Sequence, residues 1–112
     1  MDEHTVTVLI HFVTHQERQL QFEALTRAHV ETRQKALGCL RAELLQDVDS
    51  PDQFTLIEVF ASQAAIDAYY ESREYNTWHA KVKPWLKVYS GRDQRWRVGG
   101  PGDPSANHRA LS

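Results

Sequence analysis

Four side chains in this sequence have the chemistry of general acids and bases, and they could meet in one site. They are His11, His29, Tyr69 and His79. An imidazole titrates near neutral pH, so it can take a proton from a phenol or quinol hydroxyl. The resulting anion is electron-rich enough to react directly with dioxygen, without a flavin or a metal. Each histidine can also be a semi-buried, hydrogen-bonded structural residue, and this alternative stays open.

Apolar and aromatic residues could line the same site and hold a planar ligand. Tyr69 and Tyr70 would point about 100° apart on a helix, so only one can face the site, and we choose Tyr69. Arg92 could bind an anionic group of a substrate or simply lie on the surface. An aromatic stripe at helical spacing can equally belong to the core. The predicted substrate-binding residues are therefore Leu9, Phe60, Tyr75, Trp78 and Arg92.

Glu58 is an acidic residue in an otherwise apolar run. If this carboxyl group is buried, it must be paired or its pKa must be raised. Glu58 is then either a structural partner of an arginine or histidine, which we favour, or a second proton acceptor.

The elements that must position these residues follow from the periodicity. Alternation with many β-branched residues predicts a strand over residues 5–13. Spacings of three and four predict a helix over residues 16–36, and Gly38 suits its C-terminus. Two strands, over residues 39–48 and 53–60, form a predicted hairpin.

The second half repeats a helix and a strand. Ser62 is a candidate N-cap of a short helix that reaches Tyr70. A second helical segment carries Tyr75 and Trp78 and ends near Pro84. A short strand over residues 87–92 follows. The order strand, helix, strand, strand, helix, strand predicts an α+β fold, the ferredoxin-like split βαβ arrangement with an antiparallel sheet.

Both faces of this predicted sheet are apolar, yet its helices can cover only one. We assign the face of Leu9 and His11 to the helices, so that His11 meets His29. The opposite face then needs a second copy or a ligand to cover it, and we expect a homodimer packed sheet to sheet. The residues expected at this dimer interface are Val6, Val8, Ile10 and Phe12.

Length and composition are those of one globular domain. The chain has 112 residues, a formal net charge of −2 and 41% hydrophobic residues. We expect a domain over residues 1–92 and a tail over residues 93–112, rich in glycine and proline, that is mobile or packs on the dimer partner. No apolar run could span a bilayer and no leader pattern opens the chain, so we expect a cytoplasmic protein that does not bind membranes.

Several site types find no support. The six histidines show no close pair at metal-ligand spacing, and Cys39 is the single cysteine, so we predict no metal site. The glycines after residue 98 are not followed by a helical pattern, which disfavours a nucleotide cofactor. The strand over residues 53–60 lacks the basic, glycine-containing pattern of an RNA-binding surface, so nucleic acid is not an expected partner.

A longer stretch carries a family resemblance. The run from Thr55 to Ser72, TLIEVFASQAAIDAYYES, preceded by Gly38-Cys39-Leu40, resembles the antibiotic biosynthesis monooxygenase family, and the similarity covers about residues 5–92. The segment from Leu40 to Asp47, with Tyr75 and Ser90-Gly91-Arg92, is most similar to the branch of quinol oxygenases and autoinducer-2 isomerases. The resemblance implies a dimeric α+β barrel of ferredoxin-like subunits.

The resemblance also implies an activity. Members include cofactor-free oxygenases of quinols and polyketide phenols, haem-degrading enzymes and an isomerase of phosphorylated autoinducer-2. We therefore expect a monooxygenase that uses dioxygen and no bound cofactor. An isomerase or cyclase of a small metabolite, or a non-catalytic binding dimer, remains an alternative.

The chain departs from the family pattern at two places. The family often has histidine where this chain has Tyr69, so that a phenol would take over any acid-base role there. Haem-degrading members use an asparagine, a tryptophan and a histidine where this chain has Leu9, Tyr69 and His79, and only the histidine matches. Haem degradation is therefore disfavoured.

Overall fold

A computed structural model describes residues 5–90 and, for the backbone alone, residues 95–97. The chain forms β1 (Val6–Thr14), a 3₁₀ turn (Gln16–Arg18) and the long helix α1 (Gln19–Gln34), followed by the hairpin of β2 (Cys39–Gln46) and β3 (Gln53–Phe60). Two shorter helices, α2 (Gln63–Tyr70) and α3 (Arg73–Val82), lead through a second 3₁₀ turn (Lys83–Trp85) to β4 (Leu86–Ser90) and β5 (Arg95–Arg97).

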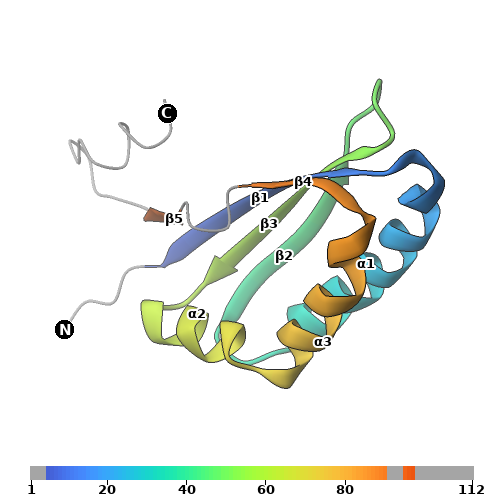
Figure 1. Cartoon of the computed structure of the whole chain (residues 1–112). Helices are drawn as coiled ribbons and strands as arrows, with labels where there is room; N and C mark the ends of the chain where they lie inside the picture. The colour runs from blue at the N-terminus through green and yellow to red at the C-terminus, as the bar shows by residue number, and fades with distance from the viewer. Residues whose placement is uncertain (1–4, 91–94, 98–112) are drawn as a thin grey trace.

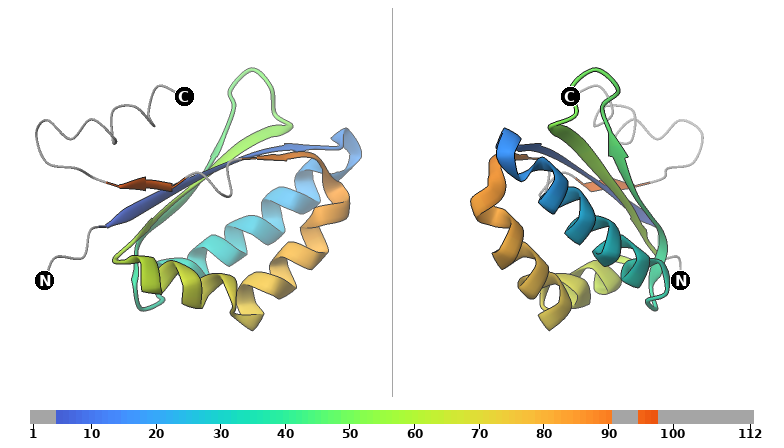
Figure 2. Two further views of the ribbon diagram at one scale, coloured as in Figure 1. Left: turned by 60° about the vertical axis from the view of Figure 1, so that its left-hand side comes forward. Right: turned by 90° about the vertical axis from the view of Figure 1, so that its right-hand side faces the viewer.

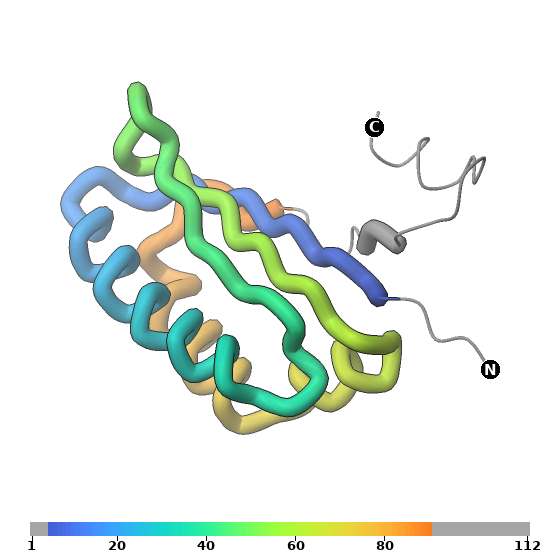
Figure 3. Tube along the Cα trace, turned by 180° about the vertical axis from the view of Figure 1, so that it is seen from behind, coloured from blue at the N-terminus to red at the C-terminus, as the bar shows by residue number. Residues whose placement is uncertain are grey.

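The strands form one antiparallel sheet in the order β2-β3-β1-β4 (Figures 1 and 3). β5 also pairs with β1. β4 pairs with residues 11–14 of β1 and β5 with residues 6–8, so the two short strands share one edge. The α+β, ferredoxin-like architecture expected from the element order is confirmed. The strand β5 was not expected from the sequence.

All three helices lie on one face of the sheet, as Figure 2 shows. The β1 side chains beneath them are Val6, Val8, Ile10 and Phe12, all 8% exposed or less. The Phe12 ring packs 5.2 Å from that of the α1 residue Phe22, centroid to centroid. The predicted assignment of the sheet faces is therefore wrong, because the residues expected at a dimer interface form the core under the helices.

Relative apolarity explains this reversal. On β1 the inner face is apolar from Val6 to Phe12 and polar only at its last residue, Thr14, whereas the other face includes Thr7 and His11. On β3 the inner face likewise carries the larger side chains, among them Phe54 and Phe60. The helices cover the more apolar face because its burial removes more apolar surface from water. Leu9 and His11 consequently lie on the outer face, half-buried.

Two serine caps set the start of the helices that follow β3. The Ser62 Oγ accepts a hydrogen bond from the Ala65 amide at 3.2 Å, which confirms the predicted N-cap of α2. The Ser72 Oγ accepts one from the Tyr75 amide at 3.1 Å and caps α3. Each oxygen satisfies an amide that the first helical turn leaves without a partner. The caps thereby orient the two helices that carry most of the aromatic residues.

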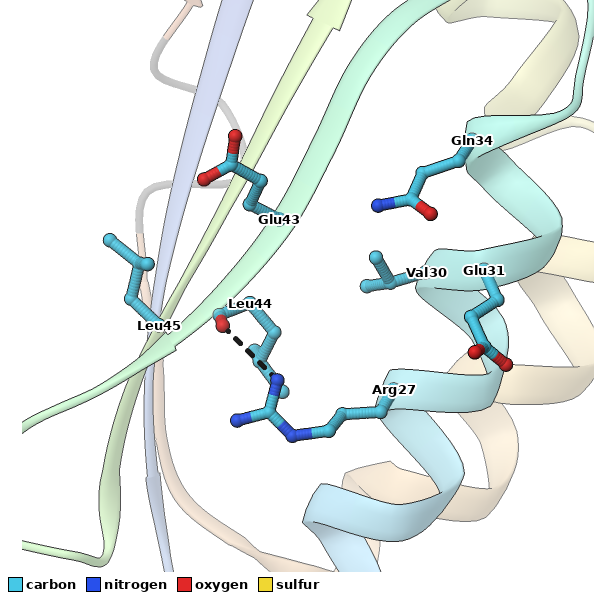
Figure 4. Close-up of a pocket in the computed structure, with 7 residues that line it drawn as sticks. All are labelled: Arg27, Val30, Glu31, Gln34, Glu43, Leu44 and Leu45. Atoms are coloured by element: carbon cyan, nitrogen blue, oxygen red, sulfur yellow. Dashed lines mark hydrogen bonds between the residues drawn. The ribbon is translucent and has the colours of Figure 1, made fainter.

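The free edge of β2 is covered by side chains of α1. The Arg27 Nη1 donates to the Leu44 carbonyl at 3.4 Å, and the Gln34 Nε2 donates to the Ala42 carbonyl at 2.8 Å. Figure 4 shows the shallow groove between the two elements, with Val30 and Leu44 inside it. These bonds occupy carbonyls that an edge strand would otherwise offer to another chain.

Some predictions fall outside the described residues. Arg92 and most of the proposed tail are among them, so the boundary at residue 92 remains a prediction. None of the helices within the described ranges is long and apolar enough to cross a membrane.

Candidate functional site

Three of the predicted site residues meet between the helices and the sheet. The His29 Nε2 on α1 lies 2.6 Å from the Tyr69 hydroxyl on α2, and both side chains are buried. The His29 ring also stacks on the Trp78 indole of α3, with centroids 4.7 Å apart and planes 10° apart. The Trp78 Nε1 donates to the Thr26 Oγ1 at 3.0 Å, which holds the indole in position. Tyr69 of α2 and Trp78 of α3 thus hold the α1 imidazole in one orientation.

Two buried ionisable residues, Arg33 and Glu58, lie next to this group on the side of Tyr69. Arg33 lies one helical turn after His29 and is 5% exposed, with its guanidinium carbon 3.9 Å from the Tyr69 ring centroid. Its Nη1 donates to the Glu74 Oε1 on α3 at 3.2 Å. Glu58, on the inner face of β3, is 1% exposed. Phe60 shares that face, and its ring lies 5.7 Å from the Tyr69 ring.

Burial decides the protonation state of these groups. Burial, and secondarily the charge of Arg33, lowers the pKa of His29 to about 4, so the imidazole is neutral at pH 7. Burial raises the pKa of Glu58 to about 7, although Arg33 opposes that change. Burial, followed by the nearby Glu58 carboxyl, raises the pKa of Tyr69 well above its usual range. Tyr69 therefore stays a neutral phenol that can both donate and accept a hydrogen bond.

A groove between α1 and α3 leads from the surface to this cluster. Its volume is about 500 Å³. His29 and Trp78 line it together with the apolar Leu25 and Ala28, and Arg73 and Lys81 contribute cationic groups. Thr32, Glu74 and Thr77 complete the lining, so the groove combines apolar surface with one imidazole and with charged groups of both signs.

The other predicted residues of α3 form a neighbouring cluster. The half-buried His79 ring stacks on Tyr75, with centroids 5.4 Å and planes 18° apart, and lies 5.3 Å from the Tyr89 ring of β4. The Tyr75 and Tyr89 hydroxyls are 3.0 Å apart. Tyr75 also touches Tyr69, with ring centroids 5.1 Å apart. His79 is thus joined to the His29 cluster through Tyr75.

Leu9 and His11 do not join either cluster. They lie on the outer face of the sheet, so the predicted meeting of His11 with His29 is wrong. The inward orientation predicted for Tyr69 is confirmed, because Tyr69 is 3% exposed while Tyr70 is only half-buried. Catalytic or binding roles for the predicted residues remain predictions.

Sequence reasoning overlooked Arg33. Arg33 lies four residues after His29, and residues four apart share one face of a helix. This spacing could have placed Arg33 on the same buried face as His29. A charged residue is rarely assigned to a buried face, and this makes the signal easy to dismiss.

No three histidine, cysteine, aspartate or glutamate side chains gather as a metal site within the described part of the chain. A cation at the cluster would also meet the buried guanidinium of Arg33.

The fold and the cluster define a class, namely a ferredoxin-like α+β domain with a buried cluster of aromatic and titratable side chains between helices and sheet. The antibiotic biosynthesis monooxygenase family matches residues 5–81, and the chain belongs to that family. No curated protein matches the sequence.

Solved structures show the same fold. A candidate antibiotic biosynthesis monooxygenase from Nitrosomonas europaea is 24% identical, with a TM-score of 0.73 over 92% of this chain and 96% of that one. Another candidate of this name, from Bacteroides thetaiotaomicron, is 13% identical, with a TM-score of 0.75 over 88% and 90% of the two chains. A conserved protein from Methanosarcina mazei is 16% identical, with a TM-score of 0.76 over 87% and 95%.

Proposed function

We propose that the protein is a monooxygenase that oxidises a quinol or polyketide-type phenol with dioxygen in the groove between α1 and α3, without a bound cofactor. The observation that carries the proposal is the buried imidazole of His29, which lines that groove and is held by Tyr69 and Trp78. Membership of the family supports the class of reaction.

The proposed reaction begins with loss of the substrate's hydroxyl proton to His29. Dioxygen then bonds to a ring carbon of the electron-rich anion, and the peroxide anion takes up the proton. The resulting hydroperoxide loses water to leave a quinone, so one oxygen atom enters the product and the other leaves as water. All four electrons that reduce dioxygen come from the substrate. Leu25 and Ala28 offer apolar surface for an aromatic substrate, and the groove also carries the cationic Arg73 and Lys81 beside the Glu74 carboxyl group.

The test is oxygen uptake with a panel of quinols and polyketide phenols, with and without metal chelators. We expect uptake that chelators leave unchanged, and His29→Ala should lower turnover by about 10²- to 10⁴-fold. The matched variant His11→Ala, on the opposite face of the sheet, should keep turnover, while His79→Ala tests the second candidate base. Product formed without oxygen uptake would instead indicate an isomerase, and stoichiometric haem or flavin in the purified protein would contradict the cofactor-free reaction.

We also propose that a second copy covers the outer face of the sheet. Among the described residues no helix covers this face, and it carries Leu45 and Val88, which are 48% and 42% exposed. Further apolar side chains of this face among the described residues are Leu9, Val13, Ile57 and Val59, all half-buried. A symmetric homodimer whose two outer sheet faces pack against each other would bury these side chains.

A further inference from the structure

The two helices that line the groove lie side by side and run antiparallel (Figure 2). Arg33, near the C-terminal end of α1, bonds Glu74 in the first turn of α3. The next contact along the groove joins His29, one turn earlier on α1, to Trp78, one turn later on α3. One end of the groove is therefore marked by the Arg33–Glu74 ion pair, and the other end lies beyond the stacked rings of His29 and Trp78.

Leu25 and Lys81 form the end beyond the stacked rings, which we call the distal end. Leu25 lies one turn before His29 and Lys81 lies three residues after Trp78, so both stand on the same side of the two rings. Leu25 is half-buried and Lys81 is exposed. Lys81 thus brings a cation to apolar surface in a partly enclosed groove, where opposite charges attract more strongly than in open water.

The charges that line the groove do not cancel. Its titratable lining residues are His29, Arg73, Glu74 and Lys81. The Glu74 carboxylate is already paired, because it accepts a hydrogen bond from the Arg33 guanidinium at 3.2 Å. Neither Arg73 nor Lys81 forms an ion pair with a described residue. Arg73 adjoins Glu74 in the sequence, whereas Lys81 is about two helical turns from that carboxylate. The uncompensated charge at the distal end is therefore that of Lys81.

We propose that the groove selects a ligand with an anionic group, and that Lys81 binds this group at the distal end. The inference rests on the proposed function, since the ligand is then the phenolic substrate, and it narrows that substrate to a phenol that also carries an acidic group such as a carboxylate. A single aromatic ring can reach from His29 to Lys81, because their levels differ by about one helical turn, roughly 5 Å, and the lysine side chain is long and flexible.

The test compares two probes of nearly the same shape, para-hydroxybenzoate, which is an anion at neutral pH, and the uncharged para-hydroxybenzamide. Isothermal calorimetry on the full chain gives the dissociation constant of each. We expect the wild type to bind the anion roughly five- to tenfold more tightly. Added salt should reduce this preference. Lys81→Gln should abolish the preference, and Lys81→Arg should keep it.

Two further variants locate the effect. Lys83→Gln removes the same charge from an exposed lysine of the second 3₁₀ turn, which is not among the residues that line the groove, so it should match the wild type. Ala28→Phe puts a ring into the groove and should weaken the binding of both probes. Circular dichroism checks that each variant is folded.

Equal affinities of the wild type for the two probes, or no binding of either at millimolar concentration, would overturn the inference. A Lys81→Gln variant that keeps the preference for the anion would do the same. The proposed function survives these results if uncharged quinols still give oxygen uptake. An anion preference that depends on Lys81, without oxygen uptake from any phenol, would instead support the binding site and contradict the proposed function.

Discussion

At the scale of single residues, the hydroxyl of Tyr69 is the link between His29 and the rest of the buried cluster. Tyr69→Phe keeps the ring that packs on Phe60 and under the Arg33 guanidinium, but it removes the hydrogen bond to His29. We expect the free energy of unfolding to fall by about 1 kcal/mol. We expect turnover to fall by a larger factor than that loss of stability explains. Urea unfolding and oxygen uptake measured on the same preparation check this, and full activity in the variant would contradict it.

Glu58 also predicts a pH-dependent stability. The pKa of this carboxyl group rises through burial from its ordinary value of 4.5 to about 7 in the folded chain. Below pH 4.5 the group is protonated in both states, whereas above 7 the folded chain must hold a buried charge, so stability is lost as pH rises through this window. Glu58→Gln does not show this loss, because the glutamine amide does not ionise. Relative to the wild type, the variant should gain roughly 3 kcal/mol of unfolding free energy between about pH 4.5 and 8.

The measurement is urea unfolding of both proteins at the two ends of that window. His29 changes stability in the opposite direction. Because its pKa is lowered in the folded chain, the unfolded chain binds the proton first as pH falls below 6.5, and the free energy of unfolding decreases. This contribution is present in both proteins and cancels in their difference. A difference between variant and wild type that stays constant with pH would mean that Glu58 is not buried as a titrating group.

At the scale of elements, the turn from α1 to β2 depends on Gly38. Its φ of +83° is unfavourable for residues with a side chain, and a Cβ there would lie 2.9 Å from the Ala65 Cβ of α2. Gly38→Ala should therefore lower the free energy of unfolding by more than about 1 kcal/mol. Adding Ala65→Gly should recover the part of the lost free energy that comes from the close contact with Ala65. The part that comes from the positive φ of residue 38 should remain lost. Thermal unfolding of the single and double variants separates the two, and no recovery would show that the contact is unimportant.

At the scale of the whole molecule, adjacent residues of β1 test which face of the sheet meets a partner. Val8 is fully buried under the helices, and Leu9 lies on the outer face. Val8→Glu should destabilise the subunit by several kcal/mol, because it buries an unpaired charge in the core. Leu9→Glu should leave the subunit folded and dissociate the proposed dimer. Light scattering at micromolar concentration, together with thermal unfolding, distinguishes the two, and a Leu9→Glu variant that remains a dimer would contradict the sheet-to-sheet pairing.

The sequence by itself determined the types and the order of the main elements. Alternation and helical spacing follow from local geometry, so β1, α1, the hairpin and the cap at Ser62 could be predicted near their observed bounds. The same local geometry showed that only one of Tyr69 and Tyr70 can face inward, and the choice of Tyr69 is confirmed by its burial. The resemblance carried by residues 55–72 was enough to predict the family.

Only the tertiary structure decided which face of the sheet the helices cover and which polar groups meet beneath them. A period of two separates the faces of a strand but does not say which is inside when both are apolar, and here this placed His11 away from His29. The His29–Tyr69 and Trp78–Thr26 bonds join residues 40 and 52 positions apart, and Arg33 and Glu58 come near Tyr69 from different elements. Such meetings depend on how α1, α2 and α3 pack on the sheet, because no local pattern encodes a distance between residues so far apart in the chain.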